Sequence, residues 1–137
     1  MDRETLGKLA LKARKNAYAP YSHFAVGAAL LVKDGTVYTG CNIENASFSP
    51  TNCGERTAFF KAVSEGKREF SAIAIAGARE EREPESPCPP CGVCRQVMAE
   101  FCDPETFEVL LVTKDGVAQT YLLKELLPQG FQKSELG

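Results

Sequence analysis

Three cysteines and one glutamate are the residues whose types and spacing suit metal chemistry. Cys53 stands two residues before Glu55, and Cys88 and Cys91 follow at a C-x-x-C spacing. Thiolates at this spacing are typical ligands of zinc. Three protein ligands leave a fourth metal position open, as in catalytic rather than structural zinc sites. We therefore interpret Cys53, Cys88 and Cys91 as ligands of one zinc ion, with Glu55 acting at the open position.

Each half of this pattern has an ordinary explanation when it is taken alone. Asn52 and Glu55 also fit a capping box, in which an acid at the third helical position bonds back to the cap residue. A single C-x-x-C is equally compatible with a redox pair. The combination is more specific, because Cys-x-Glu opening one helix and Pro-Cys-x-x-Cys opening another match the three-cysteine form of the zinc deaminase signature.

The expected helix N-termini favour this chemistry. The macrodipole and the free N–H groups there stabilise thiolates, which are the metal-binding form of cysteine. Three thiolates leave a zinc site with net negative charge, so we expect Arg56 to donate to the cysteine sulfurs rather than to lie free on the helix surface. Glu55 is expected to take a proton from zinc-bound water, pass it to a ring nitrogen of the substrate, and later protonate the leaving amine.

Composition sets the broad class of the protein. The chain has 137 residues, of which 44% are hydrophobic and 25% charged, so we expect one globular domain over residues 1–137. Its net charge of −2 and its pI near 5.5 argue against a nucleic-acid partner. No apolar segment predicts a signal peptide or a membrane span. Because three of the six cysteines are assigned to metal, a reducing cytoplasm is the expected location.

The apolar periodicity predicts an α/β fold. Helices that alternate with strands indicate a three-layer α/β/α sandwich around a mixed five-stranded sheet. Helices are expected at Thr5–Asn16, from Cys53 to near Gly66, at Cys91–Phe101 and at Leu122–Leu127. Strands are expected at Ala25–Val32, Thr36–Cys41, Ser71–Ala78, Phe107–Thr113 and Val117–Tyr121, with an irregular segment at Asn42–Pro50 that precedes the first cysteine of the site.

Along nearly its whole length the chain resembles the small, homotetrameric cytidine deaminases. The segments that carry this resemblance are Tyr21–Leu30, Gly40–Ser47, Cys53–Ala58, Pro90–Gln96, and Leu126–Pro128 followed by Phe131. The resemblance implies a cytidine deaminase-like fold. It also implies hydrolytic deamination of cytidine and 2′-deoxycytidine in pyrimidine salvage, with zinc-bound hydroxide attacking C4 of the base.

The resemblance also implies roles for individual residues. It makes Cys53, Cys88 and Cys91 the ligands and Glu55 the proton carrier. It places Phe24 against the base and Asn42 and Glu44 on the ribose hydroxyls, and it adds Ala46 and Phe131 to the substrate-binding residues. In the family, the C-terminal aromatic residue reaches into a neighbouring subunit, so a homotetramer with shared active sites is expected. Cys41, Cys94 and Cys102 are interpreted as small buried hydrophobic residues.

Three other functions remain compatible with parts of the sequence. A structural zinc module would need a fourth protein ligand, for which His23, Cys94 or Cys41 is available. A thiol oxidoreductase would use Cys88 and Cys91, although prolines separate them. A deaminase acting on nucleic acid would need basic patches with interleaved aromatic residues, which the chain lacks. A free nucleoside is the favoured substrate.

Overall fold

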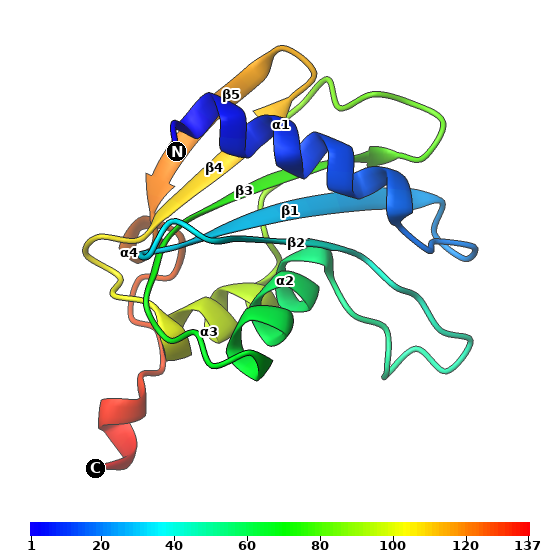
Figure 1. Cartoon of the computed structure of the whole chain (residues 1–137). Coiled ribbons are helices and arrows are strands. Elements are labelled where there is room, and N and C mark those ends of the chain that lie inside the picture. Colours follow the sequence, from blue (N-terminus) through cyan, green and yellow to red (C-terminus); the bar gives the residue numbers. More distant parts are fainter.

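A mixed sheet with helices on both faces forms the body of the molecule (Figure 1). The computed structural model describes all 137 residues. Its helices are α1 (Arg3–Ala13), α2 (Gly54–Ser64), α3 (Gly92–Phe101) and α4 (Leu123–Leu126), with short 3-10 turns η1 (Arg14–Asn16) and η2 (Lys133–Leu136). Its strands are β1 (Phe24–Val32), β2 (Val37–Cys41), β3 (Phe70–Arg79), β4 (Glu108–Thr113) and β5 (Gly116–Leu122).

The five strands lie in the order β2-β1-β3-β4-β5, which puts β3 at the centre. β1 pairs antiparallel with both β2 and β3, and β4 pairs antiparallel with β5. Only β3 and β4 run parallel, because α3 crosses over between them. The expected mixed five-stranded sheet is confirmed, and each expected element lies within a few residues of its predicted place.

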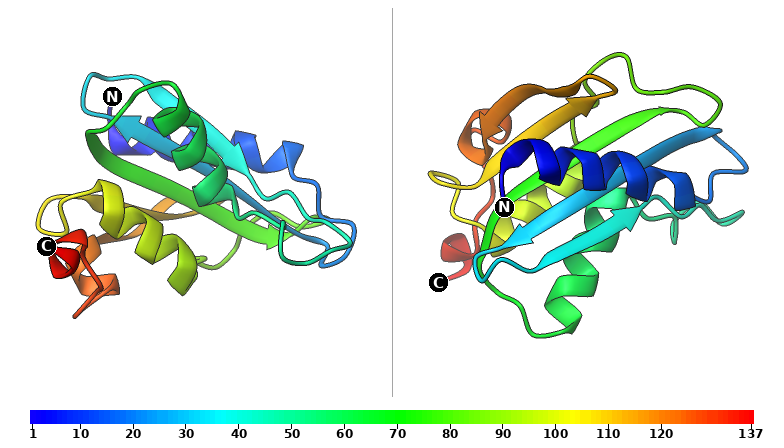
Figure 2. Two further views of the ribbon diagram at one scale, coloured as in Figure 1. Left: turned by 90° about the horizontal axis from the view of Figure 1, so that it is seen from below. Right: turned by 45° about the horizontal axis from the view of Figure 1, so that its top comes forward.

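Two hydrophobic cores separate the three layers. On one face, α1 alone packs on the sheet through Leu6 and Ala10, which belong to the same buried cluster as Leu110 and Val112. On the other face, α2 and α3 lie side by side (Figure 2) and enclose a larger cluster that contains Phe59. The α/β/α sandwich therefore follows from strands that are buried on both faces.

The sheet brings α2 unusually close to β2. A Cβ atom on Gly40 would lie 2.5 Å from the backbone oxygen of Gly54 and 2.5 Å from the backbone nitrogen of Ala58. Only glycine fits there without moving the helix. Gly40 thereby fixes the first turn of α2, which carries Cys53 and Glu55. None of the helices combines the length and the apolar character that crossing a membrane requires.

Candidate active site

The N-termini of α2 and α3 meet beneath the sheet, and a cysteine begins each helix. Cys53 is the N-cap residue of α2 and Cys91 is the N-cap residue of α3, and neither caps its helix through a side-chain hydrogen bond. The alternative explanation of Asn52 and Glu55 as a capping box does not apply, because Cys53 and not Asn52 is the N-cap residue. Because the sulfurs are not used as caps, they are available for another partner next to two positive helix ends.

Three thiols converge at this point, from Cys53, Cys91 and Cys94. The sulfurs of Cys53 and Cys91 are 3.9 Å apart, those of Cys91 and Cys94 are 3.5 Å apart, and all three lie within 4.8 Å of one another. Sulfurs bound tetrahedrally to zinc at about 2.3 Å are separated by roughly 3.8 Å. The donor set and its spacing therefore fit one zinc ion.

The ligand set differs from the prediction at one position. Cys88, expected as a ligand, does not belong to the group of three thiols, and Cys94 takes its place. Prolines on both sides of Cys88 keep that segment extended, so its side chain turns toward β3. A Cβ atom on Gly77 would lie only 2.7 Å from the Cys88 sulfur. Cys94, by contrast, lies in the first turn of α3 and shares a face with Cys91.

The electrostatics of the three sulfurs favour an ionised Cys53. Hydrogen bonding with Cys94 and with the Arg56 guanidinium lowers the pKa of Cys53 to about 5. The pKa of Cys94 is raised, because its thiol is hydrogen-bonded to the sulfur of Cys53 and because it is buried. Burial and the nearby charges of Glu55 and Cys53 also raise the pKa of Cys88, to about 11, so geometry rather than thiol acidity separates Cys94 from Cys88.

Arg56 behaves as the charge argument predicts. Its Nη2 donates to the Cys53 sulfur at 3.2 Å. Its Nε is buried and has no acceptor within the chain. A buried hydrogen-bond donor without an acceptor costs free energy. A further negatively charged acceptor beside this nitrogen would therefore be favourable. Arg56 is thus directed at the thiol cluster rather than at solvent.

Glu55 occupies the second position of α2 and is only 4% exposed. Burial raises the pKa of its carboxyl to about 7, and the charge of Cys53 adds to the effect. A carboxyl group with a pKa near neutrality can both accept and release a proton at physiological pH. The fold therefore holds one proton-exchanging group beside three thiols.

A cavity of about 270 Å³ is lined by Cys53, Cys91 and Glu55. Asn42 lines it and is 9% exposed. The Asn42 side chain binds the backbone of β1, accepting from the Val26 N–H at 2.9 Å and donating to the Phe24 oxygen at 2.8 Å. This residue consequently fixes the start of β1 at the edge of the cavity. The lining residues are Val26, Asn42, Glu44, Thr51, Asn52, Cys53, Glu55, Cys88, Pro89 and Cys91.

Glu44 also lines this cavity, at its outer side. Its carboxylate accepts hydrogen bonds from the backbone N–H groups of Tyr21 and Ser22, at 3.0 and 3.1 Å, and from the Ser22 hydroxyl. These bonds, that of the Ser22 hydroxyl first, lower the pKa of Glu44. Glu44 therefore places a fixed negative charge at the rim.

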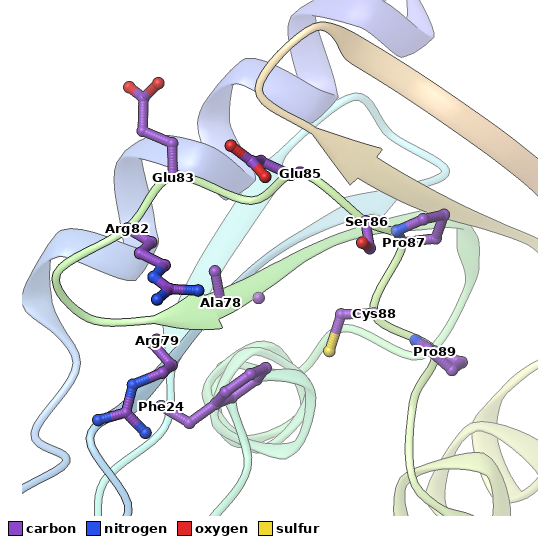
Figure 3. Close-up of a pocket in the computed structure, with 11 residues that line it drawn as sticks. Phe24, Ala78, Arg79, Arg82, Glu83, Glu85, Ser86, Pro87, Cys88 and Pro89 are labelled. Atoms are coloured by element: carbon purple, nitrogen blue, oxygen red, sulfur yellow. The ribbon is translucent and has the colours of Figure 1, made fainter.

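Phe24 lines a neighbouring cavity of about 440 Å³, which shares Cys88 and Pro89 with the first. In Figure 3, the ring of Phe24 and the sulfur of Cys88 extend toward the same space from two sides. Gly77 lies between them, because a Cβ atom there would also come within 3.1 Å of Phe24. Phe24 is 38% exposed, so one part of its ring remains open to a ligand.

Phe24 lines only the neighbouring cavity, and two further predicted substrate-binding residues line neither of the two cavities. Ala46 is exposed in the irregular segment after β2 and lines no part of either cavity. Phe131 is 58% exposed in the C-terminal segment, which extends away from the sheet (Figure 1). Its backbone oxygen accepts a hydrogen bond from Gln96 Nε2 at 2.6 Å, which holds the segment against α3.

The structure also tests two of the other functions. A fourth metal ligand is absent from the thiol cluster: the His23 ring is paired with Glu80 at 2.8 Å, and Cys41 is outside the cluster. Cys91 belongs to the thiol cluster and Cys88 lies outside it, so the structure does not group these two cysteines as a pair. The site therefore has the three-ligand form expected of a catalytic metal centre.

The site and fold match known proteins along the chain. The family model of the cytidine and deoxycytidylate deaminase zinc-binding region matches residues 1–109. Cytidine deaminases from Sporosarcina psychrophila and Halalkalibacterium halodurans are both 52% identical over 137 residues, spanning 100% of this chain and 96% and 99% of theirs. A cytidine deaminase structure from Burkholderia pseudomallei has a TM-score of 0.86 and 48% identity, over 96% of this chain and 100% of that one.

Proposed function

The chain belongs to the cytidine and deoxycytidylate deaminase family, and on this premise we propose that it hydrolyses cytidine and 2′-deoxycytidine to uridine and 2′-deoxyuridine. The observation that carries the proposal is the buried Glu55, whose pKa is raised to about 7 beside three convergent thiols. Hydrolytic deamination needs an activated water and a group that moves protons between that water and the base.

Cys53, Cys91 and Cys94 hold the metal in this proposal. When bound there, Zn²⁺ supplies the Lewis acidity that makes water a nucleophile near neutral pH. The Arg56 guanidinium offsets the negative charge of the thiolates through its bond to Cys53. The two helix N-termini act in the same direction.

Glu55 carries the protons. It accepts a proton from the attacking water and delivers it to N3 of the base, which prepares C4 for addition. It then transfers the second proton of that water to the amino group at C4, which leaves as ammonia. The carboxylate ends each cycle in its starting state, so one residue serves as base and acid. Its burial excludes bulk water from these transfers.

The substrate contacts follow the edge of the cavity. Phe24 offers a partly exposed ring for stacking against the base. Asn42 and Glu44 line the outer part, where ribose hydroxyls can donate to the carboxylate. The fixed negative charge of Glu44 repels a phosphate group, which favours nucleosides over nucleotides.

We propose further that the working form is a homotetramer with shared active sites. Phe131 is 58% exposed and Phe48 is 78% exposed, so this chain leaves large aromatic rings in solvent. Closed homo-oligomers bury such exposed apolar surfaces in the interfaces between their subunits. Ala46 and Phe131 then serve the active site of a neighbouring subunit, which accounts for their distance from the cavity of their own chain.

The direct experiment is an ultraviolet assay of purified zinc-loaded protein with cytidine, 2′-deoxycytidine, CMP and cytosine. We expect rapid loss of the cytosine chromophore with both nucleosides and little with the other two. Absence of turnover of either nucleoside by protein that contains zinc would contradict the proposed function.

A further inference from the structure

A third cavity, of about 420 Å³, lies apart from the cavity that holds Glu55 and shares no lining residue with it. It is bounded by the C-terminal half of α1 and η1, by the loop after β3, and by the turn between β4 and β5. Its charged lining residues are Lys8, Lys12, Arg14, Lys15, Lys114 and Glu83.

The charge of this groove is opposite to that of the protein. Five of its side chains are cationic and one is anionic, whereas the whole chain has a net charge of −2. None of its four lysines takes part in an ion pair. The groove therefore concentrates positive charge that the chain itself does not neutralise.

The positions of these lysines disfavour the folded state. Lys8, Lys12 and Lys15 follow one another at intervals of four and three residues, so they project from the same side of α1 and η1. Like charges at this spacing destabilise a helix. The helix macrodipole offsets this repulsion for lysines at the C-terminal end of α1, but it does not explain Lys114, which comes from a separate turn.

We propose that this groove binds a linear triphosphate group, either free or as part of a nucleoside triphosphate. Lysine ammonium groups are compact charges with three donors each, and they suit phosphate oxygens in varied geometries. A single phosphate on exposed lysines is strongly screened by salt, whereas a chain of phosphates meets several ammonium groups at once. Lys8 and Lys15 are seven residues apart along α1 and η1, which at the helical rise is about 10 Å, so a row of phosphates can reach both ends of the lysine row and a single phosphate cannot.

The groove is also tied to the loop that leads into the catalytic site. The Lys114 N–H donates to the Pro84 oxygen at 2.7 Å, and Arg14 Nη2 donates to the Arg79 and Arg82 oxygens at 2.9 Å each. The same loop continues to Cys88, which lines the catalytic cavity. A ligand beside Glu83 and Pro84 therefore touches a segment that ends at the catalytic cavity.

The test is calorimetric titration of the zinc-loaded protein with inorganic tripolyphosphate and, separately, with ATP, whose base differs from that of the substrate. We expect saturable binding of one ligand per chain that weakens as sodium chloride rises from 20 to 200 mM. Tighter binding of ATP assigns the site to a nucleotide, and equal binding assigns it to the phosphate chain alone.

Two charge-matched variants locate the site. The Lys12→Gln, Lys15→Gln double variant should weaken binding by roughly tenfold, because two of the neighbouring charges are lost. The Lys33→Gln, Lys133→Gln double variant removes the same charge elsewhere and should bind like the parent, and Glu83→Gln should bind more tightly. Thermal unfolding of each variant checks the fold. Absence of saturable binding, or equal weakening in both double variants, would overturn the proposal.

Discussion

A single chain completes the metal-binding side of the active site but not the substrate-facing side. The three thiols, Arg56 and Glu55 are held by two helices and the sheet, and Glu55 is 4% exposed. Phe24, in the neighbouring cavity, is 38% exposed, and Phe131, on the C-terminal segment, is 58% exposed. The chain therefore holds the thiols and Glu55 in a fixed arrangement but leaves exposed the aromatic residues that we propose bind the base.

This difference separates the chemistry from the enclosure of the substrate. Groups that exchange protons or bind metal need low mobility and restricted water, and helix N-termini packed on a sheet provide both. Residues that close over a substrate must allow it to enter, so they lie on loops and termini. Changes on the metal side should lower kcat, and changes on the open side should raise KM.

The largest effect is expected from Glu55→Gln. The amide keeps the shape of the side chain but cannot carry protons, so turnover of cytidine should fall by about 10⁴-fold or more. Zinc content, measured by atomic absorption, should equal that of the parent. Loss of zinc in this variant would make Glu55 a ligand and contradict its assignment as the proton carrier.

A smaller effect is expected when a phosphate is added to the substrate. The Glu44 carboxylate is fixed by Tyr21 and Ser22, so it should repel CMP and lower kcat/KM by roughly 100-fold relative to cytidine. Glu44→Gln should narrow the gap between the two substrates. Equal use of CMP and cytidine by the parent would show that Glu44 does not control access to the cavity.

Removal of the C-terminal segment tests the proposal that a neighbouring subunit completes the substrate-facing side. Truncation after Gly130 deletes Phe131, and the loss of one stacking ring should raise KM for cytidine about tenfold. Phe131→Leu should have an intermediate effect. Mass in solution, measured by light scattering, should be that of four chains for the parent. Full activity of the truncated protein, or a monomeric parent, would contradict the shared site.

The smallest effect is expected from substituting Arg14. This residue lies on the opposite face of the sheet and binds backbone groups of the substrate-facing side. Its guanidinium donates to the backbone oxygens of Ala25, Ala78, Arg79 and Arg82, at 2.9 to 3.1 Å. Arg14→Ala should destabilise the protein by about 2 kcal/mol and raise KM more than it lowers kcat. Arg14→Lys should recover part of both. A change in kcat without a change in KM would show that Arg14 acts on the metal-binding side instead.

The helices and strands were predictable because apolar residues repeat with clearly different periods in the helical and the strand segments. Continuous apolar runs such as Ser71–Ala78 predict strands buried on both faces, and they lie in β3 and its neighbours. The pairing of β3 with β1 and β4 is less accessible to sequence reasoning, because it depends on how α3 crosses the sheet. The layers were predicted, and the strand order came from the structure.

Of the three cysteines that converge in the structure, Cys53 and Cys91 were predicted from the sequence and Cys94 was not. Cys88, Cys91 and Cys94 repeat at the same interval, so C-x-x-C spacing alone fits either pair. The deciding feature is the helix start, because α3 begins at Gly92 and puts Cys91 and Cys94 on its first turn. The Pro90-Cys91-Gly92-Val93-Cys94 segment, joined with the expected helix at Cys91–Phe101, already contained that signal. The exposure of Phe131 carried no such signal, since no local pattern says what a terminus contacts.

The most direct test of the account is the zinc content of Cys94→Ser beside that of Cys88→Ser. Both variants replace one sulfur by oxygen, and the two cysteines lie on either side of Cys91 at equal spacing. After dialysis against a weak chelator, Cys88→Ser should retain zinc and cytidine turnover near those of the parent, because its sulfur faces Gly77. Cys94→Ser should lose most of both, because its sulfur is one of the three that converge. Zinc retained by Cys94→Ser and lost by Cys88→Ser would contradict the metal centre described here.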